Sequence, residues 1–219
     1  QLDNINYTIA AFYVDWSDPQ VNVATPSGAY YAVANGNSAA SKGLETEFNW
    51  AVSNSVTVFG GYTYVDASLT NDLYLHDASD LTTGKSELRA TDGAQLPGTA
   101  ENTINIGAKH ETVLDNGLLL VSRIDGYYQS EVENSILNID PDWAATLGGF
   151  HLWFMSTTLV GDHWTASLVA KNLFNERGTV ATYKEEYMTS DVANGFYGTG
   201  QKDFITAPRT ITLKTSYRF

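Results

Sequence analysis

The first candidates for metal or acid–base chemistry are the four histidines His76, His110, His151 and His163. Their spacing matches none of the short patterns that ligate zinc, and none is paired with a carboxylate at helical distance. Cysteine, the other common transition-metal ligand and a nucleophile, is absent. We therefore interpret the histidines as scattered side chains and predict no metal site.

An acidic segment and a glycine-rich segment are the next candidates. Aspartate oxygens are suitable ligands for Ca²⁺, but the spacing of the acidic segment matches no defined calcium loop; its aspartates are Asp66, Asp72, Asp77 and Asp80. Residues 195–200 read GFYGTG, but no strand–turn–helix pattern surrounds them, as a nucleotide loop requires. No serine elbow or catalytic carboxylate pair can be argued. The sequence predicts neither an enzyme nor a bound cofactor.

Large aromatic residues in segments that are otherwise polar are stronger candidates for binding. Such rings either pack a loop onto itself or stack against a ligand, and both alternatives stay open. The candidate ligand-contacting residues are Tyr74, Trp143, Tyr183, Tyr187, Phe196 and Tyr197.

The composition limits the classes of protein to which the chain can belong. Its 219 residues are 43% apolar and 17% charged, too apolar and aromatic for a disordered chain. The net charge of −13 argues against a nucleic-acid partner, because a phosphate backbone attracts basic surfaces. No apolar run is long enough for a membrane-spanning helix, and no secretory leader opens the sequence. We expect a mature product or a fragment.

Apolar and polar residues alternate with period two along most of the chain, which indicates antiparallel β-strands. In the clearest case Ile211, Leu213 and Tyr217 share one face, whereas Lys214 and Ser216 share the other. The same alternation predicts eight strands, at about residues 5–24, 29–51, 55–68, 96–111, 117–132, 148–160, 163–174 and 205–219. The faces of 7–16 and 150–160 cannot be assigned from their sequences.

Connections of alternating length favour a transmembrane β-barrel over a soluble sandwich. Long segments at 69–95, 133–146 and 175–203 alternate with short turns near 51–54, 112–117 and 161–163. Barrels of the outer membrane place short turns in the periplasm and long loops outside. The aromatic residues lie near strand ends, as in the aromatic girdles at a membrane interface. The tight turn at 25–28 on the outer side fits only if its strands extend beyond the membrane.

Six segments resemble, in order, the closing part of the barrel of a TonB-dependent outer-membrane receptor. They are GLETEF at 43–48, VTVFGGYTYVD at 56–66, LPG at 96–98, KNLFN at 171–175, PRT at 208–210 and SYRF at 216–219. The resemblance covers nearly the whole chain, so residues 1–219 are interpreted as the C-terminal portion of such a barrel. In the family, KNLFN marks a barrel element and no ligand site.

The resemblance implies an all-β fold: eight antiparallel strands that close a 22-stranded transmembrane barrel, whose plug and TonB box lie upstream. It implies uptake of a scarce ligand, such as an iron chelate, cobalamin or an oligosaccharide, across the outer membrane of a Gram-negative bacterium. The implied partners are membrane lipid, the rest of the barrel, the plug, the TonB complex, the barrel-assembly machinery and a small-molecule ligand. Two alternatives are a stand-alone eight-stranded barrel with a structural or adhesive role and, less favoured, a secreted β-sandwich.

The final strand also resembles the signal that the barrel-assembly machinery reads. The alternating apolar residues of this predicted signal are Ile211, Leu213, Tyr217 and Phe219.

The alternation of loop lengths predicts which segments reach the cell surface. Cysteines introduced as Asp77→Cys, Asp142→Cys and Asp191→Cys should react with a membrane-impermeant thiol reagent on intact cells, because each lies in a long loop. An Asn116→Cys variant, in a short turn, is the control. Equal labelling of that variant would reverse the predicted orientation.

Overall fold

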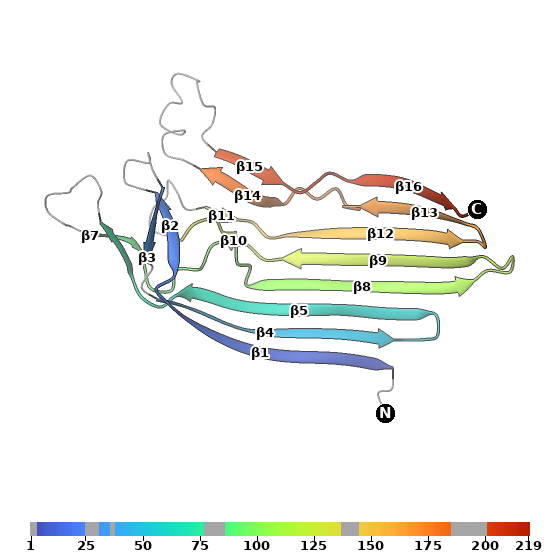
Figure 1. Cartoon of the computed structure of the whole chain (residues 1–219), viewed down its shortest axis with the longest axis horizontal. Coiled ribbons are helices and arrows are strands. Elements are labelled where there is room, and N and C mark those ends of the chain that lie inside the picture. Colours follow the sequence, from blue (N-terminus) through green and yellow to red (C-terminus); the bar gives the residue numbers. More distant parts are fainter. Residues whose placement is uncertain (1–3, 25–30, 36–37, 77–85, 137–144, 185–200) are drawn as a thin grey trace, which may run out of the picture.

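A computed structural model describes residues 4–24, 31–35, 38–76, 86–136, 145–184 and 201–219. These residues form β-strands and loops, and they contain no helix long and apolar enough to cross a membrane. Eight strands make one antiparallel sheet in which neighbours in the chain are neighbours in space (Figure 1). In order they are β1 (Ile5–Ser17), β4 (Ser38–Ala51), β5 (Val56–Leu69), β8 (Asn102–Val113), β9 (Leu119–Gln129), β12 (Phe150–Val160), β13 (Trp164–Lys171) and β16 (Thr210–Tyr217). The predicted all-β, antiparallel fold is confirmed.

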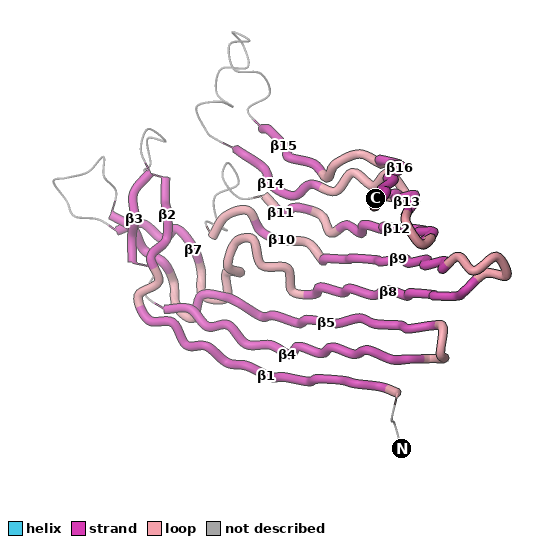
Figure 2. The backbone as a smooth tube through the Cα atoms, turned by 45° about the vertical axis from the view of Figure 1, so that its right-hand side comes forward, coloured by secondary structure: helices cyan, strands magenta, loops and turns pink. Residues whose placement is uncertain are grey.

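Four two-stranded ribbons extend from one end of the sheet, and the short turns lie at the other end (Figure 2). The ribbons pair β2 (Gln20–Ala24) with β3 (Tyr31–Asn35), β6 (Leu73–His76) with β7 (Ser86–Ala90), β10 (Val132–Glu133) with β11 (Thr146–Leu147), and β14 (Thr179–Lys184) with β15 (Gln201–Ile205). We call these the ribbon end and the turn end of the sheet.

The ribbons change the predicted strand boundaries in two ways. The single strand expected over 5–24 is divided between β1 and β2 at Asp18 and Pro19. Asp18 has a φ of 51°, and Pro19 has no N–H with which to continue the ladder. The strand expected over 29–51 is likewise divided into β3 and β4. Strand pairs also form where alternation predicted only connections: β6 and β7 lie within 69–95, and β14 and β15 lie within 175–205.

The turns at the turn end are closed by backbone and hydroxyl hydrogen bonds. The Ser53 hydroxyl oxygen accepts hydrogen bonds from the N–H groups of Ser55 and Val56. Gly117 has a φ of 82° in the β8–β9 turn, a conformation that glycine adopts without a Cβ clash. These compact turns allow each strand to return directly beside its predecessor.

One register runs through all eight strands and separates their side chains into two faces. Leu44 of β4, for example, is the register partner of Ala11 on one side and of Tyr64 on the other. Side chains of directly opposed residues lie on the same face of a sheet. We call the face that carries Leu44 the apolar face and the face that carries Glu45 the polar face. The register also assigns the two strands that alternation left open: Ile9 and Trp153 belong to the apolar face.

The apolar face has the pattern of a lipid-facing surface. Most of its aromatic residues lie toward the two ends of the strands, and its central residues, among them Ile9, Ile106 and Leu213, are exposed although they are strongly hydrophobic. The exposed aromatic residues are Tyr7, Trp50, Trp164 and Tyr217 toward the turn end and Tyr13, Tyr64 and Tyr128 toward the ribbon end. Residues 5–13 cover about 27 Å at about 3.4 Å per residue. At a tilt of about 40° they rise about 21 Å, close to the apolar band of about 25 Å in outer-membrane barrels.

The sheet is open, because β1 and β16 each pair on one side only among the strands that the structure describes. The eight strands therefore do not close on themselves into a stand-alone eight-stranded barrel, the first of the two alternatives. They also do not divide into the two stacked sheets of a sandwich. The curved single sheet in Figures 1 and 2 leaves backbone groups of both edge strands available for further strands.

Adjacent residues of β16 test the assignment of the faces in the intact receptor. Leu213→Arg should destabilise the inserted protein by about 2–4 kcal/mol, because it places a cation in hydrocarbon. Thr212→Arg changes the neighbouring residue on the polar face and should have a small effect. Folded yield and unfolding temperature in detergent micelles measure both. Equal losses would show that the register does not separate lipid from the interior.

Candidate functional site

The polar face carries most of the charged residues of the sheet and is the candidate functional surface. They are Glu45, Glu47, Lys109, Glu111, Arg123, Asp125, Lys171 and Lys214. The apolar face carries three charged residues, Asp15, Lys42 and Asp66, all toward the ribbon end of β1, β4 and β5. There Lys42 Nζ lies 3.0 Å from Asp66 Oδ2. The charges therefore lie on the polar face or toward the ribbon end.

A group of four charges occupies the polar face of β8 and β9. Lys109 and Arg123 are direct register partners, and like charges in that position destabilise a sheet. Each cation has an acid two residues further along its own strand. Lys109 Nζ lies 3.1 Å from Glu111 Oε2, and Arg123 Nη2 lies 2.6 Å from Asp125 Oδ1. Arg123 Nε donates to both oxygens of Asp125, so the two ion pairs offset the repulsion between the cations.

An aromatic ring from the next strand supports this group. The guanidinium carbon of Arg123 lies 4.7 Å from the centroid of the Phe59 ring, within the range of a cation–π contact. Phe59 is the register partner of Gly107, and a Cβ on Gly107 would lie 2.5 Å from the ring. The glycine thus provides the space in which the Phe59 ring lies. Residues from β5, β8 and β9 together fix one guanidinium on the polar face.

Glu45 and Glu47 are the acidic counterpart on β4. They share the polar face two residues apart, and neither forms an ion pair with another residue of the described ranges. Their register partners on β5, Thr63 and Gly61, are small and uncharged. Two carboxylates are therefore available to a cationic group above this part of the polar face.

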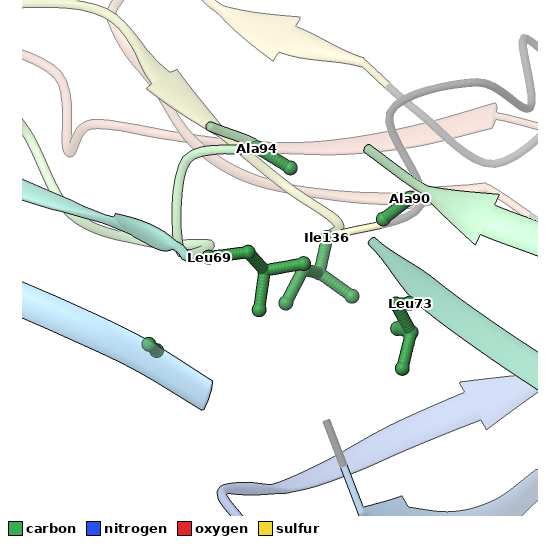
Figure 3. Close-up of a cluster of buried hydrophobic side chains, with 6 residues drawn as sticks. Leu69, Leu73, Ala90, Ala94 and Ile136 are labelled. Carbon is green, nitrogen blue, oxygen red and sulfur yellow. The ribbon is translucent and has the colours of Figure 1, made fainter. Parts of the chain in front are cut away.

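A small apolar core joins the ribbon end of the sheet to the loops beyond it. Ala39 and Leu69 are register partners on the polar face, and Leu73, Ala90 and Ile136 pack against them from the β6–β7 ribbon and the segment after β10 (Figure 3). The Leu69 N–H donates to the carbonyl oxygen of Ala94 and the Gly93 N–H donates to the carbonyl oxygen of Leu69, which fixes the returning segment beside β5. This rim core, comprising Ala39, Leu69, Leu73, Ala90, Ala94 and Ile136, fixes the base of the β6–β7 ribbon on the polar side of the sheet.

Two of the predicted ligand-contacting aromatic residues lie among the described residues, and they belong to different ribbons. Tyr74 lies on β6 with its side chain 53% exposed, and its hydroxyl donates a hydrogen bond to Asp72. Tyr183 lies on β14, opposite Lys202 of β15, and thus belongs to a different ribbon. The other four, Trp143, Tyr187, Phe196 and Tyr197, lie outside the described residues. Their role in binding stays a prediction.

A buried asparagine, whose contacts the sequence did not reveal, joins β13 to the approach to β16. Asn172 is 4% exposed and has a φ of 49°. Its amide nitrogen donates to the carbonyl oxygens of Glu176 and Ala207, and its amide oxygen accepts from the N–H of Glu176. Thr206 extends this junction, because its hydroxyl donates to the same Glu176 oxygen and accepts from the N–H of Gly178. These bonds agree with the interpretation of KNLFN as a barrel element, because they fix the end of β13 beside the segment that leads into β16.

The other predicted residues occupy separate positions. Ile211, Leu213 and Tyr217 lie on the apolar face of β16, and the Tyr217 and Phe219 rings meet edge to face at 5.1 Å. That these residues form a signal for the barrel-assembly machinery stays a prediction. The histidines lie on β6, β8, β12 and the β12–β13 turn. Within the described ranges no three histidine or acidic side chains are grouped to hold a metal ion.

Comparison with known proteins identifies the family. The family described as TonB dependent receptor-like, beta-barrel matches residues 1–173. The chain therefore belongs to the β-barrel family of TonB-dependent receptors, as its six sequence segments suggested. No curated protein sequence matches the chain.

Solved structures of receptors share the fold of the chain. The ferric yersiniabactin uptake receptor FyuA of Yersinia pestis is 16% identical with a TM-score of 0.71, and the match covers 98% of this chain and 28% of FyuA. The siderophore receptor PiuA of Acinetobacter baumannii is 17% identical with a TM-score of 0.68, covering 98% and 26%. The copper transporter OprC is 14% identical with a TM-score of 0.67, covering 99% and 29%. The chain thus spans less than a third of the length of each.

The junction at Asn172 supports a test of local stability. Asn172→Ala should destabilise the intact receptor by about 2–4 kcal/mol, since it removes three hydrogen bonds and places a Cβ residue without a polar side chain in a left-handed conformation. Asn172→Gly relieves the backbone conformation but not the lost bonds, so it should be intermediate. Unfolding temperatures of both variants would measure the two contributions. Identical values for the parent and Asn172→Ala would contradict this role.

Proposed function

We propose that the chain forms the closing strands of an outer-membrane receptor that takes up a scarce ligand by TonB-coupled transport. The observation that carries the proposal is the open, two-faced sheet of a family barrel, with every ribbon at one end. A membrane barrel needs an apolar outer surface, and its strands need partners at both edges. The apolar face supports the first requirement, and the edges of β1 and β16, each unpaired on one side among the described strands, support the second. The family match supports both.

In this proposal the apolar face meets lipid and the polar face lines the interior, where it faces a plug supplied by another part of the receptor. The short turns lie in the periplasm and the ribbons lie outside the cell. This orientation agrees with the rim core, which fixes the β6–β7 ribbon on the interior side, where a ligand would enter. Transport energy comes from the TonB complex, which acts on the plug.

The proposed ligand is a small molecule such as an iron chelate, cobalamin or an oligosaccharide, and its first contacts are aromatic residues of the ribbons. Tyr74 is the best-supported of these, because it is exposed on a ribbon whose base is packed in the rim core. Leu73, the preceding residue, is only 1% exposed in that core. A ring held in this way can stack on a ligand at a low entropic cost. The solved siderophore receptors share the fold of the chain and favour an iron chelate as the first ligand to test.

The experiment is ligand uptake by cells that produce the intact receptor, compared with cells that lack its gene. A panel of labelled ferric chelates, cobalamin and oligosaccharides should give receptor-dependent uptake of one class, and removal of TonB should abolish it. Tyr74→Ala should weaken surface binding of that ligand by about tenfold, the effect of a stacking contact of about 1.4 kcal/mol.

Tyr7→Ala is the matched control, because Tyr7 is an exposed tyrosine toward the turn end of β1 and should not affect binding at the cell surface. Uptake that persists without TonB, or an absence of receptor-dependent uptake across the panel, would reject the proposed function. Equal binding by the parent and Tyr74→Ala would reject only the role of Tyr74.

A further inference from the structure

We propose that the apolar face carries a binding site for the phosphate group of an outer-leaflet lipid, formed by Arg209 and an aromatic ledge of three residues. The ledge consists of His151, Trp153 and Phe174. This inference rests on the proposed membrane location of the sheet. It concerns the outside of the barrel and is separate from the ligand contacts proposed for the ribbons.

The turn after β13 holds Phe174 in an exposed position. Asn172 and Asn175 both have left-handed backbone conformations, with φ values of 49° and 56°. The N–H of Asn175 bonds to the carbonyl oxygen of Asn172, and Asn172 itself is buried. Phe174, between them, is nevertheless 62% exposed. A well-bonded turn that presents a large apolar ring in this way is suited to contact with a bilayer.

The ring of Phe174 meets two others on the apolar face. Its centroid lies 6.4 Å from that of His151 and 6.3 Å from that of Trp153, with interplanar angles of 79° in both pairs. Trp153 lies over Gly126, where a Cβ would come within 2.8 Å of its ring. The N–H of Leu173 donates to the carbonyl oxygen of Trp153, which holds the turn against β12. The three rings form one continuous aromatic surface.

Arg209 supplies a positive charge beside this surface. Its Nη1 lies 3.3 Å from the carbonyl oxygen of Leu173, the residue before Phe174, and its backbone N–H donates to Asn175 Oδ1. The guanidinium is exposed, and no carboxylate pairs with it among the described residues. Its remaining N–H groups are therefore available to an anion. Arginine binds phosphate oxygens through two parallel hydrogen bonds.

The position along the strands identifies the anion as a lipid headgroup. Trp153 and His151 lie on the ribbon side of Met155, at the register level where Tyr128 ends the apolar band. Aromatic rings collect at this depth, and basic residues there contact lipid phosphates. A phosphorylated lipid provides acyl chains for the rings and an anion for Arg209.

The test measures lipid binding by the intact receptor, purified in a neutral detergent. The probes are lipid A with two phosphates and the same lipid with its phosphates removed, and native mass spectrometry gives their affinities. The parent should bind the phosphorylated lipid about tenfold more tightly. Arg209→Gln should remove this preference and Arg209→Lys should retain part of it. Phe174→Ser should weaken the binding of both lipids.

Arg218→Gln is the matched control, because it removes the same charge at the turn end, where the backbone N–H of Arg218 bonds to His163. It should leave the preference intact. Equal binding of the two lipids by the parent, or equal losses in Arg209→Gln and Arg218→Gln, would overturn the proposal. So would displacement of lipid A by millimolar inorganic phosphate, because the site would then bind free phosphate. A lipid preference that depends on Arg209 in a receptor without ligand uptake would reject the proposed function and leave this site standing.

Discussion

The register of the eight-stranded sheet is the constraint on which the other features depend. Backbone N–H and C=O groups in hydrocarbon must pair with one another, since no water can replace a missing partner. Side chains alternate with period two, so a slip of one residue would move a whole apolar row to the opposite face. The unbroken register from β1 to β16 satisfies both demands at once.

Several local features follow from this register. Glycines stand where a large ring from a neighbouring strand must lie, as Gly107 does for Phe59 and Gly126 does for Trp153. The first of these pairs places a ring under Arg123 on the polar face, and the second places the Trp153 ring on the apolar face in edge-to-face contact with Phe174. A glycine opposite a large ring is therefore used on both the polar face and the apolar face.

Alternation predicted the faces correctly wherever aromatic residues kept to one side, as in β4, where Leu44 and Phe48 oppose Glu45 and Glu47. It could not assign β1 or β12, because neither strand carries a charged residue on its polar face. The Lys42–Asp66 ion pair and the Arg123–Phe59 contact were also beyond sequence reasoning, since each joins two strands whose register the sequence does not give. The bonds of Asn172 to Ala207 are hidden for the same reason, and the ribbons are too short to show a clear period.

The distribution of charge on the polar face has a consequence for any occupant of the interior. Lys109, Arg123 and their acids neutralise one another across the middle of the sheet. Glu45 and Glu47, toward the β1 edge, make no ion pair within the described ranges, and the same is true of Lys171 and Lys214, toward the β16 edge. Charge interactions at the centre are therefore satisfied within the sheet, whereas the flanks present opposite signs to their surroundings. A segment inside the barrel would be oriented by these flanks, which lie next to the edges where further strands must pair.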